Sequence, residues 1–145
     1  MKKIIAVLAA VLVLLASACS VTGTKPFKDL TSDEIESVSV NCIPPDKTVE
    51  TDDTDRIDEL VEILNRLVIY DEDDKEYAGQ SVTFTITKTD GTVTRINAYN
   101  PQLIIDGVKY STKQEPCSKL NDLGNRWIDE LSADGKTFDE VKKLL

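Results

Sequence analysis

Apolar residues recur in the middle of this chain at the spacing of a helix that buries one face. Residues 57–68 follow the i, i+3, i+4, i+7 pattern, and mainly carboxylates occupy the opposite side. The side chain of Asp53 or Thr54 would cap the start of this helix. A second helix is predicted over residues 118–131. It contains Gly124 at a cost of about 1 kcal/mol relative to alanine, and this glycine would let the helix pack close to a sheet.

Alternating apolar and polar residues predict strands before the first helix. Residues 38–42 alternate so that two valines and Cys42 would face a core. Thr31 and Glu34 fit a capping box, which predicts a single helical turn in front of this strand. After a proline-containing turn, residues 47–51 would return as a short edge strand.

Residues 81–99 predict a β-hairpin whose register follows from the hydrophobic pattern. A two-residue loop would place Phe84 opposite the polar Asn97. A three-residue loop ending at Gly91 in the left-handed conformation places Phe84 opposite Ile96 instead. Because a slip of one residue moves every side chain to the other face, the three-residue loop is favoured.

A second hairpin and a final amphipathic segment complete the pattern. The second hairpin spans residues 103–110 and turns at an Asp-Gly pair, which places Leu103 opposite Tyr110. Residues 136–145 predict a short amphipathic helix. The whole order predicts an α+β domain with an antiparallel sheet of about four to six strands, and its long helix and C-terminal helix packed on one face.

The N-terminus has the three parts of a signal peptide. Two lysines precede an uninterrupted apolar run over residues 4–15, and three small residues follow it at 16–18. The run is too short for a membrane span, which needs about 20 residues. The small residues "ASA" alone would suit ordinary secretion and the release of a soluble protein.

The cysteine that follows these small residues favours a different cleavage. The stretch "LLASAC" resembles the lipobox of bacterial lipoproteins. This resemblance implies cleavage between Ala18 and Cys19, a diacylglyceryl group on the Cys19 thiol, and anchoring to the cell membrane on the side facing away from the cytoplasm. The predicted organisation is a lipoprotein signal peptide at 1–18, a lipidated N-terminus and tether at 19–29, and a single domain at 30–145.

The chain has three cysteines, and an exported protein with an odd number needs a reason for it. Lipidation of Cys19 leaves Cys42 and Cys117, which would form a structural disulfide in an oxidising compartment. Two buried thiols are the main alternative. A redox pair is disfavoured because the chain has no Cys-x-x-Cys motif.

Charge and composition exclude several classes of function. Removal of residues 1–18 takes two lysines, leaving 15 basic and 26 acidic residues, a net charge of −11. Nucleic acid is therefore a poor partner, because binding to phosphate needs clustered cations. The chain has no histidine, which removes His-dependent nucleophile systems, His-ligated zinc and the commonest general base. No catalytic residue and no cofactor are predicted.

The densest charge lies in "YDEDDKEY", residues 70–77. The carboxylates of Asp71, Glu72, Asp73 and Asp74 would form a solvated acidic loop, gather a hard cation such as calcium, or dock a basic partner. The spacing does not fit the EF-hand template, which needs a glycine at the sixth position. No metal site is therefore predicted.

The mature chain as a whole resembles small Gram-positive surface lipoproteins of unknown function. The resemblance rests on the lipobox, the "IESVSV" opening strand, the "IDELVEILNRL" helix and the "TITKTDG" and "IDGVKY" hairpins. It implies an extracytoplasmic anchored domain and transfers no catalytic residues. We expect a monomeric, non-enzymatic binding domain that engages a protein or small ligand through the outer sheet face or the acidic loop. The alternative is an inhibitory or accessory module for an exported enzyme or sensor.

Overall fold

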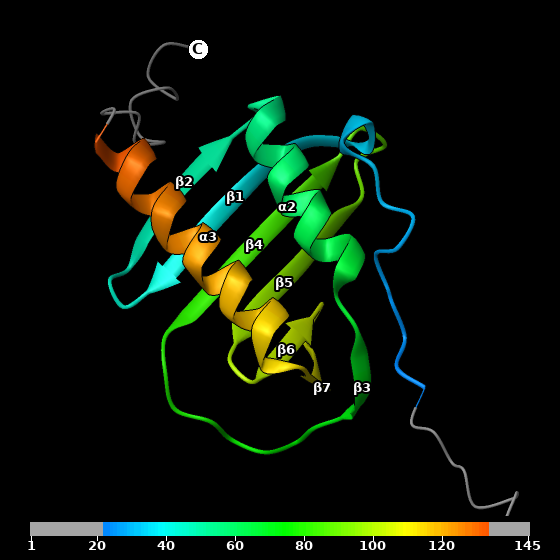
Figure 1. The fold of residues 1–145 in the computed structure, drawn as a ribbon. Helices are drawn as coiled ribbons and strands as arrows, with labels where there is room; N and C mark the ends of the chain where they lie inside the picture. Colours follow the sequence, from blue (N-terminus) through cyan, green and yellow to red (C-terminus); the bar gives the residue numbers. More distant parts are fainter. Residues whose placement is uncertain (1–21, 134–145) are drawn as a thin grey trace, which may run out of the picture.

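The computed structural model describes residues 22–133, in which an antiparallel sheet carries both α-helices on one face (Figure 1). The sheet has seven strands in the order β2-β1-β4-β5-β6-β7-β3. The strands are β1 (Ile35–Ile43), β2 (Lys47–Thr51), β3 (Ile69–Glu72), β4 (Ser81–Lys88), β5 (Val93–Tyr99), β6 (Gln102–Ile105) and β7 (Val108–Thr112). The helices are the 3-10 turn η1 (Ser32–Glu34), α2 (Thr54–Arg66) and α3 (Gln114–Ala133). The predicted α+β class is confirmed, but the predicted four to six strands are too few.

The strand that the sequence pattern missed is β3. The predicted helix ran to residue 68, whereas α2 ends at Arg66 and the backbone at Leu67 is already extended, with φ −69° and ψ 132°. Leu67 nevertheless remains fully buried. Because both a helix and an extended segment can bury an apolar residue here, periodicity alone extended the predicted helix through residues 67–68, up to the start of β3.

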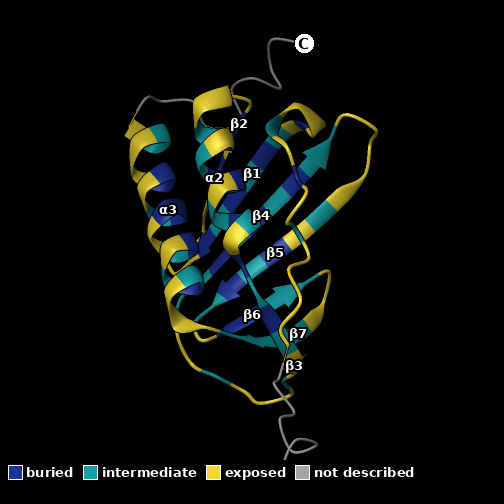
Figure 2. Ribbon diagram, turned by 45° about the vertical axis from the view of Figure 1, so that its right-hand side comes forward, coloured by how far each residue is buried: buried dark blue, intermediate teal, exposed yellow. Residues whose placement is uncertain are grey.

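Asp53 is the N-cap of α2 and is one of the two residues predicted for this position. Its carboxylate accepts a hydrogen bond from the backbone N–H of Arg56 at 3.0 Å. The buried face of α2 keeps the predicted helical spacing through Ile57, Leu60, Val61 and Leu64. Figure 2 shows the buried residues of α2 on the side toward the sheet and exposed residues on its outer side.

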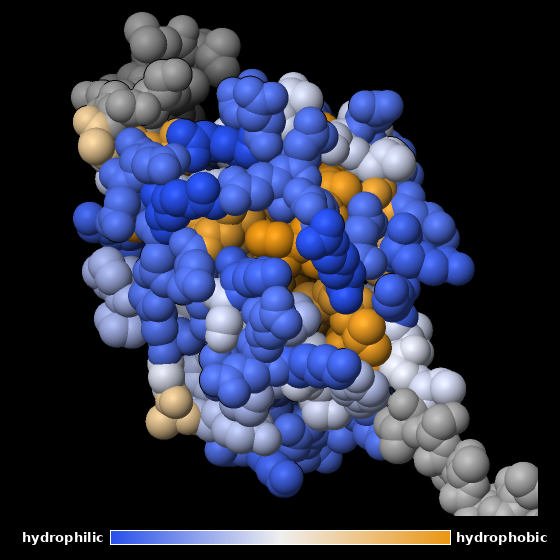
Figure 3. All heavy atoms as spheres, viewed as in Figure 1, coloured by the Kyte–Doolittle hydropathy of each residue, from blue (hydrophilic) through white to orange (hydrophobic). Residues whose placement is uncertain are grey.

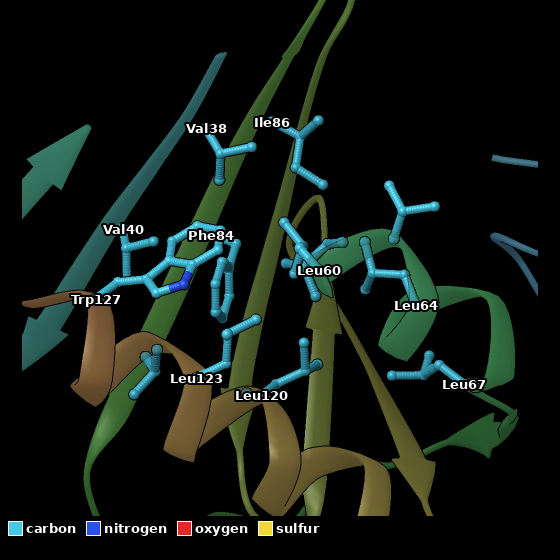
Figure 4. Close-up of a cluster of buried hydrophobic side chains, with 14 of the residues drawn as sticks. Val38, Val40, Leu60, Leu64, Leu67, Phe84, Ile86, Leu120, Leu123 and Trp127 are labelled. Atoms are coloured by element: carbon cyan, nitrogen blue, oxygen red, sulfur yellow. The ribbon is translucent and has the colours of Figure 1, made fainter. Parts of the chain in front are cut away.

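Helix α3 crosses the same face of the sheet and supplies the largest core side chain. It begins four residues before the predicted start and ends two residues after the predicted end. Trp127 is fully buried and meets Phe84 of β4 edge-on, with ring centroids 5.9 Å apart (Figure 4). Gly124 is buried against β1 and β4, so the predicted close approach of this helix to the sheet is confirmed.

Both hairpins have the predicted registers. Phe84 pairs with Ile96 across β4 and β5, and Gly91 lies in the left-handed region with φ 85°. Leu103 pairs with Tyr110 across β6 and β7. The predicted placement of these side chains on the core face is therefore confirmed.

The first strand and the turn before it also follow the prediction. Val38, Val40 and Cys42 are fully buried, and β2 returns as an edge strand beside β1. The backbone N–H of Thr31 donates to the carboxylate of Glu34 at 3.0 Å, which completes the capping box.

The predicted tether, residues 19–29, is packed against the domain over its described part. Thr24 forms a β-bridge with Ile69, Phe27 packs against the core, and Leu30 is buried. Residues 1–21, which include the predicted cleavage site and Cys19, lie outside the described part of the chain, as does the predicted helix at 136–145. Within residues 22–133, no helix is long and apolar enough to cross a membrane.

Candidate functional site

A groove lies between α2 and α3 on the helix side of the sheet. Its cavity volume is about 780 Å³, in the range of small-ligand sites. The two helices run antiparallel, because Arg56 near the start of α2 pairs with Glu130 near the end of α3 at 2.6 Å. The lining residues are Glu59, Glu62, Ile63, Arg66, Val68, Lys113, Glu115, Pro116, Lys119, Asp122, Leu123 and Arg126.

The walls of this groove come from one additional face of each helix. Each helix packs its main apolar face on the sheet, and the flank that faces the other helix carries charged residues above a few apolar ones. The apolar part consists of Ile63, Val68, Pro116 and Leu123. Figure 3 shows hydrophobic surface exposed on the helix side of the domain and surrounded by hydrophilic residues.

The rim charges of the groove balance one another although the chain is strongly acidic. Four acidic and four basic side chains line it. Arg66 pairs with Glu62 at 2.6 Å. Arg126 pairs with Glu59 and closes one end of the groove. The exposed rim is thus neutral overall and offers both signs of charge to a ligand.

Near its other end, the groove is lined by one ion pair and by Lys113. Lys119 lies 2.9 Å from Glu115, and its hydrogen bond lowers the pKa of the Glu115 carboxyl. Lys113 is exposed and makes no ion pair with any residue of the segment 22–133. This end therefore presents a cation to an incoming ligand.

The structure divides the predicted acidic loop between a strand and an ordered loop. Asp71 and Glu72 are exposed on the edge strand β3. Asp73 accepts hydrogen bonds from the backbone N–H of Lys75 at 3.1 Å and the hydroxyl of Tyr77 at 2.9 Å. These bonds, the backbone one first, lower the pKa of Asp73, and the bond with Asp73 raises the pKa of Tyr77.

The acidic side chains do not converge on one point. Glu76 pairs with Lys109 of β7 at 2.7 Å, and this bond raises the pKa of Lys109. Gln102 donates to the backbone carbonyl of Asp73 at 2.6 Å and so fixes the start of the loop. Over the described ranges, no group of three or more acidic or cysteine side chains could hold a metal ion. Asp74 remains exposed in the loop.

The expected disulfide is not present, because Cys42 and Cys117 are free buried thiols. The Cys117 thiol donates to the backbone carbonyl of Gln102 at 3.4 Å. Burial raises its pKa to about 11. The pKa of Cys42 is also raised, first by burial and then by the negative charge of Asp129.

The sheet keeps the two thiols apart. Cys42 lies on β1, whereas the Cys117 thiol bonds to Gln102 of β6. These two strands are three steps apart in the sheet, which is roughly 14 Å. A disulfide needs Cα atoms about 4.4–6.8 Å apart. Sequence reasoning paired the cysteines by elimination and had no information on this separation.

The outer face of the sheet, the other predicted interaction surface, is polar and half-buried. It carries Thr83, Thr85 and Thr87 of β4 beside Arg95 and Asn97 of β5. The described part of the chain has a second, smaller hollow of about 420 Å³, similar in size to small-ligand pockets. It lies between residues 25–30 and the ends of β4 and β5.

Sequence reasoning did not identify the groove. The signal was Ile63, which departs from the main apolar stripe of α2 and lies only partly buried beside it. The groove can hold a molecule with apolar groups for its floor and charged groups for its rim. Comparison of the chain with protein-family models, curated proteins and solved structures gives no match.

Proposed function

We propose that this protein is a membrane-anchored extracytoplasmic lipoprotein whose domain is a non-enzymatic binding module. The signal peptide at residues 1–18 and the lipobox cysteine at position 19 support the anchor and the location. The binding site is the groove between α2 and α3. Its open volume and its apolar floor within a charged rim are the observation that carries the proposal.

The ligand that this groove suits best is a short amphipathic segment of a partner protein. A helix laid between two helices presents apolar residues to the floor and charged residues to both walls. The apolar floor residues lie on both sides of the groove, with Ile63 on one helix and Leu123 on the other. A rim with four charges of each sign suits a peptide, which carries both signs, better than a ligand of one charge.

The lowered pKa of the Glu115 carboxyl and the ion pairs of the rim support binding rather than catalysis. A general acid at neutral pH needs a raised carboxyl pKa, whereas the pKa of Glu115 is lowered by Lys119. Glu62 is paired with Arg66 at 2.6 Å, and Glu59 is paired with Arg126. Three of the four groove carboxylates, those of Glu59, Glu62 and Glu115, are thus held in ion pairs.

In-cell crosslinking with mass spectrometry of the anchored protein tests this proposal. Ile63→Glu places a charge on the groove floor and should abolish capture of the dominant partner. Lys113→Glu reverses an exposed rim charge without disturbing packing and should weaken capture. Val93→Glu is the matched control, because Val93 is 47% exposed and lies outside the groove. Equal capture by all variants would disprove the groove as the binding site.

A second candidate function rests on the edge strand β2. Among residues 22–133 this strand pairs with β1 alone, which leaves its other edge available to an added strand within that range. Such pairing would suit the alternative role as an inhibitory or accessory module for an exported enzyme or sensor. Crosslinks that map to residues 47–51 and survive Ile63→Glu would favour this role over the groove.

A further inference from the structure

The N-terminal segment is held on the outer edge of β3 by two backbone hydrogen bonds. The N–H of Thr24 donates to the carbonyl of Ile69, and the N–H of Ile69 donates to the carbonyl of Thr24, both at 2.8 Å. Without this segment β3 would be the edge of the described sheet, since its other partner among residues 22–133 is β7. Thr24 therefore continues the sheet by one further bridge.

The residue before this bridge fits only as glycine. A Cβ atom on Gly23 would overlap Cγ1 of Val68 and would lie 2.8 Å from Cε1 of Tyr70. Real Cβ atoms are not found at such distances, so a larger residue would have to displace the segment or these two side chains. The segment stays attached beyond the bridge, because Phe27 packs on the core and Leu30 is buried.

This attachment leaves a short connection to the predicted lipid. Four residues lead from Cys19 to Gly23, so the connection spans at most about 14 Å. The sheet has six steps between β3 and β2, which place its far edge about 29 Å away. The greatest length of the connection is thus about half the width of the sheet, and the connection begins at the β3 edge.

We propose that this docking fixes the orientation of the domain, with the β3 edge toward the bilayer and the β2 edge away from it. The inference rests on the proposed lipid anchor at Cys19. Val68 touches the docked segment and also lines the groove. The Val68 end of the groove therefore opens close to the membrane surface.

Fluorescence quenching in vesicles tests this orientation. The full lipoprotein is reconstituted into vesicles that carry spin-labelled headgroups, with a fluorophore on Asp71→Cys of β3 or on Thr48→Cys of β2. Both positions are exposed, and the two native thiols described in the structure are buried. We expect strong quenching at position 71 and none at position 48. Equal quenching at both positions, or stronger quenching at 48, would overturn the proposal.

Two variants separate docking from simple attachment. Gly23→Val should release the segment from β3 and reduce the difference between the two labels. Gly79→Val should leave the difference unchanged, because nothing lies within 4 Å of a Cβ atom on Gly79. The fluorescence of Trp127 reports that each variant is folded. A difference between the labels that survives Gly23→Val unchanged would overturn the role of the docked segment.

A mass measurement distinguishes failure of the anchor from failure of the orientation. If the mature N-terminus carries no added lipid mass, the proposed anchor is wrong. The same labelled chain is then coupled to a lipid through its N-terminal amine and measured again. Strong quenching at position 71 alone would support the docked orientation even then, and equal quenching would reject it independently of the natural anchor.

Discussion

Gly124 of α3 lies directly against Val82 of β4, because a Cβ atom at position 124 would overlap Cγ1 of that valine. This Cβ atom would also lie 3.3 Å from Cζ of Phe84 and from Cγ1 of Val40. The helix backbone therefore approaches two strands at the distance that only a glycine permits. This contact brings Trp127, one turn further along α3, against Phe84 in the centre of the core.

Gly124→Ala should destabilise the protein. Because the new Cβ atom would overlap Val82, we expect a cost in the upper part of the usual range for overpacking, about 2–3 kcal/mol. Alanine returns about 1 kcal/mol of helix propensity, so the net loss should be about 1–2 kcal/mol. Urea denaturation followed by circular dichroism measures this loss. Gly79→Ala is the control and should change the free energy of unfolding little, because its site is open. A Gly124→Ala variant as stable as the wild type would mean that the helix does not approach Val82 so closely.

The single tryptophan should report the integrity of the core. Trp127 is fully buried, so its emission should be blue-shifted and resistant to acrylamide until the protein unfolds. Trp127→Ala should cost about 3–5 kcal/mol, the usual penalty for removing a large buried ring. Val93→Ala changes an exposed side chain and should stay within about 0.5 kcal/mol of the wild type. Strong acrylamide quenching of the native protein would contradict the observed burial.

The two buried thiols should be present but unreactive in the folded protein. With a pKa of about 11, about one Cys117 side chain in a thousand is a thiolate at pH 8. Alkylation at that pH should modify neither Cys42 nor Cys117 in the native state. Both should react in denaturant without a reducing agent. If both become reactive only after reduction, the cysteines form a disulfide and the separation described above is wrong.

Asp73 should contribute a pH-dependent part of the stability. Its pKa is below the ordinary value of 3.8 in the folded state, so its contribution is present above that value and is lost as the pH falls through the folded pKa. Asp73→Asn should therefore be less stable than the wild type at neutral pH, and the difference should shrink at about pH 2. Unfolding curves of both proteins at the two pH values measure this change. A difference independent of pH would show that the charge of Asp73 is not involved.

Much of the fold could be predicted because local pattern and tertiary packing agree. The register of β4 and β5 followed from placing Phe84 and Ile96 on one face, and a loop glycine with positive φ made that register possible. The capping box at Thr31 and the cap at Asp53 followed from side chains that accept hydrogen bonds from backbone N–H groups three residues away. These interactions are short-range in sequence, so the sequence alone was enough to predict them.

The remaining features depend on contacts between distant segments. Strand β3 forms because β7 and Thr24 pair with Ile69 from both sides, and neither partner is near it in sequence. The distance between Cys42 and Cys117 depends on how α3 crosses the sheet, which periodicity does not determine. The groove arises where two helices pack on the sheet and only partly on each other. A pattern along one helix cannot predict that gap.

Site-specific photocrosslinking in cells tests the central claim, that the groove between α2 and α3 is the binding site. A photoreactive phenylalanine analogue is placed at Ile63 on the groove floor or at the exposed Val93 outside it. If this claim is right, position 63 gives one dominant protein adduct and position 93 gives none. The same adduct from both positions, or an adduct from position 93 alone, would contradict it and move the binding surface to the sheet.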